Sequence, residues 1–142
     1  MLSLQKQRYR HNPEAGTWGD CHRTAYAMLL NIPRDDVPHV FDNDRPLAEG
    51  LAIMKDFLRG RNLAEVALPV SGDCNPEQIL EQWKRYAPGV PFILGGMSSN
   101  GTNHSVAVCE GVIYDPALDD SGIVGPCDDG YYWITFLVPL PQ

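Results

Sequence analysis

Apolar residues recur with a helical period in the first half of the chain and gather in short, strand-like runs in the second half. The first periodic stretch predicts a helix from about Asp20 to Asn31, which Pro33 should end because proline cannot continue a helix. The apolar positions of this helix follow the i, i+3, i+4, i+7 spacing of one buried face: Ala25, Met28, Leu29 and Ile32.

Two further stretches predict helices. Residues 46–59 place apolar side chains along one side, and Gly60 follows in the position of a C-terminal cap. Asn75-Pro76 is a typical helix start, with asparagine as the cap and proline at the first position. We therefore expect a third helix from this point to about Tyr86.

The strand-like runs are short, apolar and bounded by turn residues. They are Leu63–Val70, Pro91–Leu94, His104–Cys109, Val112–Tyr114 and Tyr131–Val138. Helices thus dominate the first half and strands the second, which predicts an α+β fold with N-terminal helices packed on a C-terminal antiparallel sheet. A length of 142 residues suits a single domain with one core, spanning residues 1–142.

Charge and hydropathy exclude several classes of partner. The net charge of −7 without a lysine or arginine cluster argues against nucleic-acid binding, although Arg8, Arg10, Arg23 and Arg34 would form a local site for a small anion. No apolar run approaches the roughly 18 residues that span a bilayer, and the N-terminus lacks the apolar segment of a secretory signal. We expect a cytoplasmic protein without a membrane partner, unless a lysis or injection machinery moves it.

Four cysteines raise the question of a reactive thiol: Cys21, Cys74, Cys109 and Cys127. None forms a C-x-x-C pair, so a structural metal site is not indicated, and no other motif points to a cofactor. A cytoplasmic location also disfavours disulfides. Each cysteine is therefore expected to be a reduced thiol.

Cys21 follows Gly19-Asp20 at the start of the first predicted helix. The free N–H groups and dipole of a helix N-terminus favour a negatively charged sulfur, which is the nucleophilic form of cysteine. The same N–H groups would receive an oxyanion, and Gly19 would leave room for substrate. The alternative is a buried cysteine that only packs the helix.

His104 and Asp115 form the second candidate pair. If Glu110-Gly111 is a two-residue hairpin turn, Val106 faces Asp115, and His104 lies diagonally opposite that carboxylate, roughly 7–8 Å away at Cβ. Asp115 would then orient the imidazole while its other nitrogen faces the thiolate. A register slip of one residue would separate the pair; the alternative is a surface histidine and an Asp-Pro turn.

Competing residues are less suited to this role. Gly72-Asp73-Cys74 repeats the Gly-Asp-Cys tripeptide, but Asn75-Pro76 places Cys74 outside the helix cap. Cys109 is expected to pack within a hairpin, and the acidic loop around Cys127 should raise the pKa of its thiol. His11, His22 and His39 are competing bases, and the side chain of His22 should diverge from its neighbour on the helix.

The chain resembles small phage and prophage proteins of the papain-like cysteine hydrolase fold. The residues that carry this resemblance are Gln7, Gly19–Ala25, Leu29-Leu30, Val37–His39, Asn103–Val106 and Val112–Pro116. The later motif is also similar to the His…Asp-Pro hairpin of bacteriocin-processing and NlpC-type cysteine peptidases. The resemblance covers about residues 5–40 and 92–137 and implies a papain-like fold.

The resemblance also implies residue roles. Cys21 would be the nucleophile, His104 the general base and then acid, and Asp115 the orienting residue. Papain-like enzymes complete the oxyanion hole with an upstream side chain, for which Gln7 is the preferred candidate and Gln5 and Asn12 are alternatives. The Gln7-to-Cys21 separation is longer than in papain.

Two functions follow from these observations. One is a thiol hydrolase that cleaves a peptide, an isopeptide or a cell-wall amide through a Cys21 acyl-enzyme. The other is a non-catalytic binding module that sequesters a small nucleotide signal or a host protein, with Arg8, Arg10 and Arg23 as anion contacts and Trp18 and Tyr26 as stacking surfaces. The expected binding residues around the cleft are Trp18, Gly19, Asp20, Arg23 and Asn103.

Overall fold

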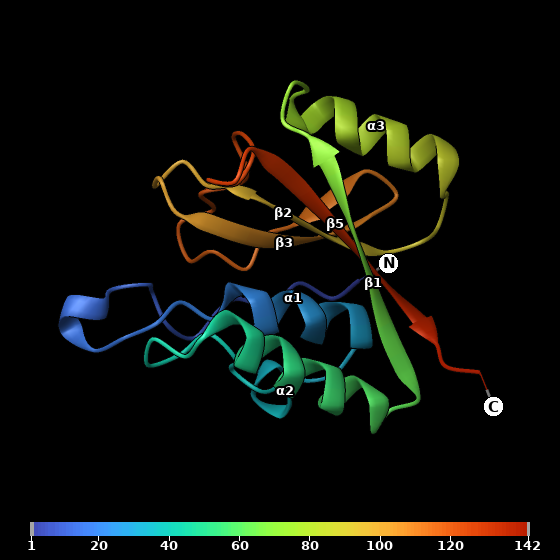
Figure 1. The fold of residues 1–142 in the computed structure, drawn as a ribbon. Coiled ribbons are helices and arrows are strands. Elements are labelled where there is room, and N and C mark those ends of the chain that lie inside the picture. Colours follow the sequence, from blue (N-terminus) through green and yellow to red (C-terminus); the bar gives the residue numbers. More distant parts are fainter. Residues whose placement is uncertain (1, 142) are drawn as a thin grey trace.

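The computed structural model describes residues 2–141 and contains three α-helices and one five-stranded sheet in that range (Figure 1). The helices are α1 (Cys21–Leu30), α2 (Leu47–Arg59) and α3 (Pro76–Tyr86). The strands are β1 (Leu63–Ser71), β2 (Phe92–Met97), β3 (Asn103–Cys109), β4 (Val112–Tyr114) and β5 (Tyr131–Pro139). Short 3-10 turns occur at Pro13–Ala15 and Arg34–Asp36. None of the described helices is long and apolar enough to cross a membrane.

The predicted helix ends are confirmed with two refinements. Asn75 and Gln78 form a capping box at the start of α3. The side chain of each residue accepts a hydrogen bond from the backbone N–H of the other residue. Helix α1 ends before Pro33, because Asn31 turns into the left-handed region at φ 56°. Gly60 follows α2 but keeps a right-handed φ of −61°, and the left-handed turn falls on Asn62 instead.

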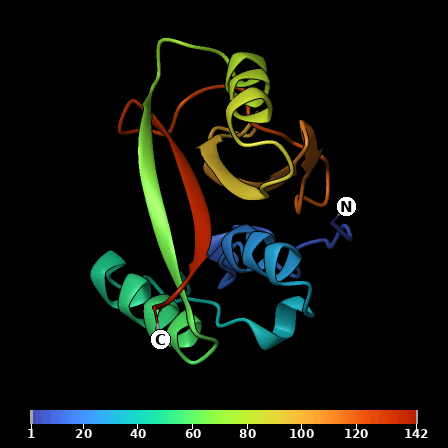
Figure 2. The same ribbon diagram turned by 90° about the vertical axis from the view of Figure 1, so that its right-hand side faces the viewer.

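The five strands form one antiparallel sheet in the order β1-β5-β2-β3-β4. The coarse α+β prediction is therefore confirmed. Segregation of helices and strands along the chain is incomplete, because β1 comes from the helical half and pairs along its whole length with β5. Figure 2 shows β1 as the outer margin of the long β1–β5 ribbon.

Each face of the sheet has its own apolar core. Helices α1 and α2 cover one face, where Ala25, Tyr26, Met54 and Leu58 pack with Ile93. Helix α3 covers the other face (Figure 1), where Ile79 packs on a group from the sheet: Phe92, Leu94, Val106, Val108, Tyr132 and Ile134. The alternation of Phe92, Ile93 and Leu94 between the two cores reflects the two-residue period of a strand. The expected single core is thus two cores on opposite faces of one sheet.

Candidate active site

Cys21 is the first residue of α1, as the sequence predicts. The preceding Asp20 is fully buried, and its carboxylate turns away from the helix that it begins. It accepts hydrogen bonds from the backbone N–H groups of Arg8 (3.2 Å) and Tyr9 (2.8 Å) and from Nε of Arg23 (3.0 Å). No side chain caps α1, so its first N–H groups are free for a negative charge beside Cys21.

The hairpin between β3 and β4 has the predicted register. Glu110 and Gly111 form the turn with φ of 52° and 75°, and Ala107 pairs with Tyr114. This register places His104 and Asp115 together, and His104 Nε2 donates to Asp115 Oδ1 at 2.7 Å.

The Asp115 carboxylate is held by several donors. Besides the imidazole, the N–H of Ala117 donates to Oδ1 (2.9 Å) and the N–H of Gly122 to Oδ2 (2.8 Å). Burial alone would raise the pKa of Asp115, but these hydrogen bonds and the charge of His104 hold it below its usual range. Asp115 is therefore an ionised group that fixes the imidazole.

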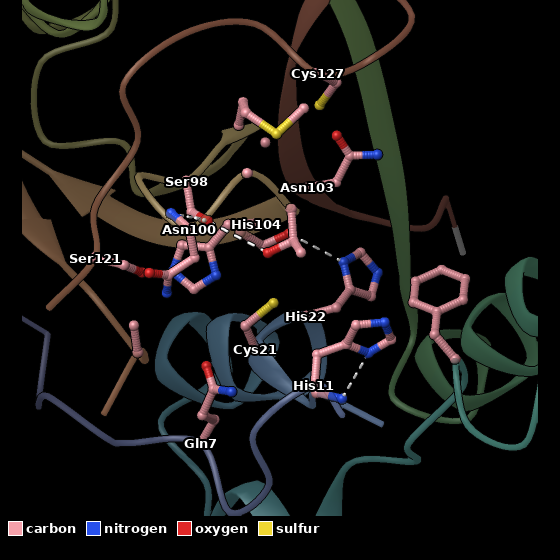
Figure 3. A pocket seen from close by; sticks show the side chains of 18 of the residues that line it. Gln7, His11, Cys21, His22, Ser98, Asn100, Asn103, His104, Ser121 and Cys127 are labelled. Carbon is pink, nitrogen blue, oxygen red and sulfur yellow. Dashed lines mark hydrogen bonds between the residues drawn. The ribbon is translucent and has the colours of Figure 1, made fainter. Parts of the chain in front are cut away.

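His104 is buried, with 7% of its surface exposed. Burial would lower the pKa of an isolated histidine. The hydrogen bond to Asp115, together with the neighbouring Cys21, overcomes this effect and raises the pKa of His104 to about 9. Because Nε2 binds Asp115, Nδ1 is the ring nitrogen left for the thiol. Figure 3 shows the Cys21 sulfur pointing into the pocket on the side of His104.

Gln7 reaches the same place despite its distance from Cys21 in the sequence. Residues 12–17 form a narrow loop whose two ends are joined by backbone hydrogen bonds between Asn12 and Thr17 (3.0 and 3.1 Å). This loop projects from the molecule and accounts for the long separation of Gln7 and Cys21 in the sequence (Figure 1). The N–H of Gln7 donates to the carbonyl of Pro116 (2.8 Å), and its buried side chain lines the pocket with Cys21 (Figure 3).

Lys6 strengthens the attachment of this segment to the Asp115 loop, and sequence reasoning gave it no role. Its Nζ donates to the carbonyls of Asp115 (3.1 Å) and Ala117 (2.8 Å) and pairs with Asp120. The segment that carries Gln7 and the loop that carries Asp115 are thus joined next to Cys21. A lysine separated from its partners by more than a hundred positions leaves no local signal of such contacts.

These residues line a cleft of about 1210 Å³. One wall comes from residues 7–12 and the start of α1, and the other from β2, β3 and their neighbouring loops. Phe41, Leu47 and His22 contribute apolar surface, whereas Asp119, Asp128 and Asp129 contribute carboxylates. The cleft is large enough for a stretch of peptide rather than a single small group.

Only two of the five expected binding residues line this cleft. Gly19 does, packed so closely on His11 that an added Cβ would lie 3.0 Å from the His11 Cβ. Asn103 does as well, and its side chain exchanges hydrogen bonds with Asp128. Trp18 lies outside the lining, with its indole N–H 3.4 Å from Asp44 Oδ1.

Asp20 and Arg23 have structural rather than ligand-binding positions. Arg23 is buried and donates to Asp20, to Asp35 (3.5 Å) and to the carbonyl of Val37 (3.5 Å). Neither residue lines the cleft. Of the other arginines expected at an anion site, Arg10 lines the cleft and pairs with Asp119, whereas Arg8 and Arg34 pair with Asp35.

His22 lies in the cleft wall, a position that its sequence neighbourhood did not reveal. Burial, with a smaller contribution from His39, lowers the pKa of His22 to about 4, so it is neutral at physiological pH. Its ring packs between Tyr26 and Phe41, and Nδ1 lies 3.5 Å from Ser105 Oγ. A neutral imidazole that faces Ser105 forms part of the cleft wall, whereas His104 is the histidine beside Cys21.

The other cysteines lack this environment. The thiol of Cys74 donates to the carbonyl of Ser71 (3.2 Å). Burial and the nearby Asp129 and Asp128 raise the pKa of Cys127 to about 11, which confirms the predicted direction. All four cysteines are free thiols. Within residues 2–141 no group of three or more histidine, cysteine or carboxylate side chains could hold a metal ion.

The chain matches none of the family models, curated proteins or solved structures with which we compared it. The resemblance to papain-like proteins therefore rests on the motifs of this sequence.

Proposed function

We propose that this protein is a papain-like thiol hydrolase that cleaves a peptide, an isopeptide or a cell-wall amide through an acyl-enzyme on Cys21. The observation that carries the proposal is the alignment of Asp115, His104 and Cys21, in which a carboxylate fixes one imidazole nitrogen and leaves the other for the thiol. The pKa of His104, raised to about 9, keeps the imidazole protonated beside Cys21 at neutral pH.

The acylation step follows from these positions. The Cys21 thiolate attacks the carbonyl carbon, and the carbonyl oxygen takes up negative charge. The free N–H groups at the start of α1 and the amide of Gln7, which lines the same cleft, would bind that oxygen. Gln7 Nε2 donates one hydrogen to the Tyr9 carbonyl (2.6 Å), which orients the amide and leaves its second hydrogen for the oxyanion.

Proton transfer by His104 completes the cycle. When the C–N bond breaks, the imidazolium donates its proton to the leaving amine. The neutral imidazole then takes a proton from water, whose oxygen attacks the thioester, and release of the acid product regenerates the thiolate. Asp115 keeps its negative charge throughout and stabilises each imidazolium form.

The binding-module alternative has less support. Of the arginines and rings expected to hold an anionic ligand, Arg23 is buried against Asp20, and the Tyr26 hydroxyl is bound to Glu65 within the core. The remaining proposal on origin is that the protein is phage or prophage encoded and acts in the bacterial cytoplasm, which rests on the motif resemblance alone.

Acylation by p-nitrophenyl acetate tests the proposed chemistry without knowledge of the natural substrate. We expect acetylation of Cys21, seen by peptide mapping, and release of more than one equivalent of nitrophenolate. Cys74→Ala is the matched control and should behave as the unaltered protein, whereas Cys21→Ala and His104→Ala should lose the reaction. Acetylation of Cys74 as fast as Cys21, or no effect of His104→Ala, would overturn the proposal.

A further inference from the structure

A second concave surface lies away from the cleft, between α2 and the first residues of β1. This groove has a volume of about 340 Å³ and shares no lining residue with the cleft. Its α2 side is formed by Leu51, Ala52, Lys55, Leu58 and Arg59, and its β1 side by Leu63, Ala64 and Glu65. The groove therefore combines an apolar floor with charged side chains at its margin.

The free edge of β1 continues from this groove. Strand β1 pairs only with β5, so the backbone N–H and C=O groups of its other edge have no strand partner within the described chain. Residues 66–71 carry no charge, and Val66 and Leu68 are exposed. Edge strands usually carry charges that prevent pairing with other chains, and only Pro69 offers such protection here.

Two basic side chains without a carboxylate partner lie at the margin of this groove; within residues 2–141, Arg61, Lys84 and Arg85 also lack an Asp or Glu side chain within 4.0 Å. Six of the eleven lysine and arginine residues pair with carboxylates: Lys6, Arg8, Arg10, Arg23, Arg34 and Arg45. Lys55 and Arg59 are exposed, lie one turn apart on α2, and have no Asp or Glu side chain within 4.0 Å. The carboxylate in the groove wall, Glu65, is engaged by the Tyr26 hydroxyl.

We infer that this surface binds an extended acidic peptide segment of a partner protein, which adds a strand to the free edge of β1. The backbone of the peptide would pair with β1, one of its apolar side chains would enter the groove, and its carboxylates would meet Lys55 and Arg59. Helix-and-edge-strand grooves suit this mode, because main-chain hydrogen bonds supply affinity and side-chain pockets supply specificity. In Figure 2, α2 lies beside the first residues of β1 and leaves the upper part of the strand open.

Two fluorescent peptides of about eight residues, the length that matches β1, test this inference. One alternates Asp with Val, and the other alternates Lys with Val, so that both favour extended backbone and differ in charge. We expect fluorescence anisotropy to show at least about tenfold tighter binding of the acidic peptide at low salt. N-methylation of alternate peptide bonds should abolish binding, and hydrogen exchange should show protection within residues 63–71.

Two double variants carry the same change in charge. Lys55→Glu/Arg59→Glu should weaken binding of the acidic peptide by about tenfold or more, and the milder Lys55→Gln/Arg59→Gln serves if that variant fails to fold. Lys84→Glu/Arg85→Glu on α3 is the matched control and should bind as the unaltered protein. Equal binding of both peptides, equal effects of the two double variants, or a dimer that forms through β1 in sedimentation would overturn the inference. Because the groove lies outside the cleft, reaction with p-nitrophenyl acetate reports on the hydrolase proposal independently.

Discussion

The chain contains the same tripeptide twice, and the two copies lie in different structural environments. Gly19-Asp20-Cys21 and Gly72-Asp73-Cys74 both precede a helix. In the first copy the aspartate is buried, α1 has no side-chain cap, and the cysteine is the first helical residue. In the second copy the aspartate is exposed, and Asn75 separates the cysteine from α3.

The difference lies in which group occupies the first N–H groups of each helix. Asn75 caps α3 with its own side chain, so those donors are not free for a neighbouring thiol. The Asp20 carboxylate instead accepts hydrogen bonds from Arg8, Tyr9 and Arg23, and these bonds hold the N-terminal segment against α1. A local tripeptide becomes a candidate nucleophilic site only where tertiary contacts redirect its aspartate and bring a histidine to its cysteine.

The largest expected effect concerns the two aspartates. Asp20→Asn removes a fully buried charge that pairs with Arg23, and we expect a loss of about 3 kcal/mol in the free energy of unfolding. Asp73→Asn, at an exposed position, should change it by less than about 0.5 kcal/mol. Urea denaturation of both variants measures this difference. Equal stability of the two variants would mean that the Asp20 carboxylate does not hold the N-terminal segment.

The two cysteines should differ nearly as much in reactivity. Iodoacetamide at neutral pH should alkylate Cys21 on the order of 100-fold faster than Cys74, because the imidazolium of His104 stabilises a thiolate at Cys21. Peptide mapping over time gives both rates in one sample. His104→Ala should bring the two rates close together, and a ratio that does not change in this variant would refute the role of His104.

His104 should also make the free energy of unfolding depend on pH. His104 has a pKa of about 9 in the fold and about 6.5 when unfolded, so between these values the folded protein binds more protons. The contribution of His104 is therefore complete below about pH 6.5 and lost as the pH rises through 9, a change of about 3 kcal/mol. We expect the free energies of unfolding of the protein and of His104→Gln, measured by denaturation from pH 6 to 9.5, to converge as the pH rises. A difference that stays constant with pH would contradict a protonated imidazole.

The smallest expected effect is a loss of stability when the cap of α3 is removed, without a change in the reactivity of Cys74. Asn75→Ala removes the side-chain oxygen that accepts from the Gln78 N–H, keeps the backbone N–H that donates to Gln78 Oε1, and should cost about 1 kcal/mol of stability. It should leave Cys74 as slow toward iodoacetamide as before, because no histidine pairs with that thiol. A large gain in Cys74 alkylation would show that free helix N–H groups alone activate a thiol, and that His104 is not needed for the contrast.

Short-range patterns predicted several elements well. The Asn75-Pro76 helix start and the Glu110-Gly111 hairpin follow from backbone preferences of a few adjacent residues. Once the hairpin register is fixed, the two-residue strand period brings His104 to Asp115, so this pairing could be predicted without a structure.

Contacts between distant segments were not predictable in the same way. Arg23 and Trp18 were expected at the cleft because they lie close to Cys21 in the sequence, yet neither lines it. Neighbours along a helix point in different directions, and a buried arginine is placed by its partners, Asp20 and Asp35, rather than by its neighbours. The position of His22 in the cleft wall likewise depends on Tyr26 and Phe41.

The sequence by itself determined the α+β class, the helix start at Cys21 and the His104–Asp115 hairpin, because each depends on local geometry. Only the tertiary structure decided that Asp20 is a buried anchor, that the loop of residues 12–17 returns Gln7 to the cleft, and that β1 leaves a free edge beside Lys55 and Arg59. These features depend on which segments bury surface against each other. Burial is a property of the whole packed chain, so no stretch of residues specifies it alone.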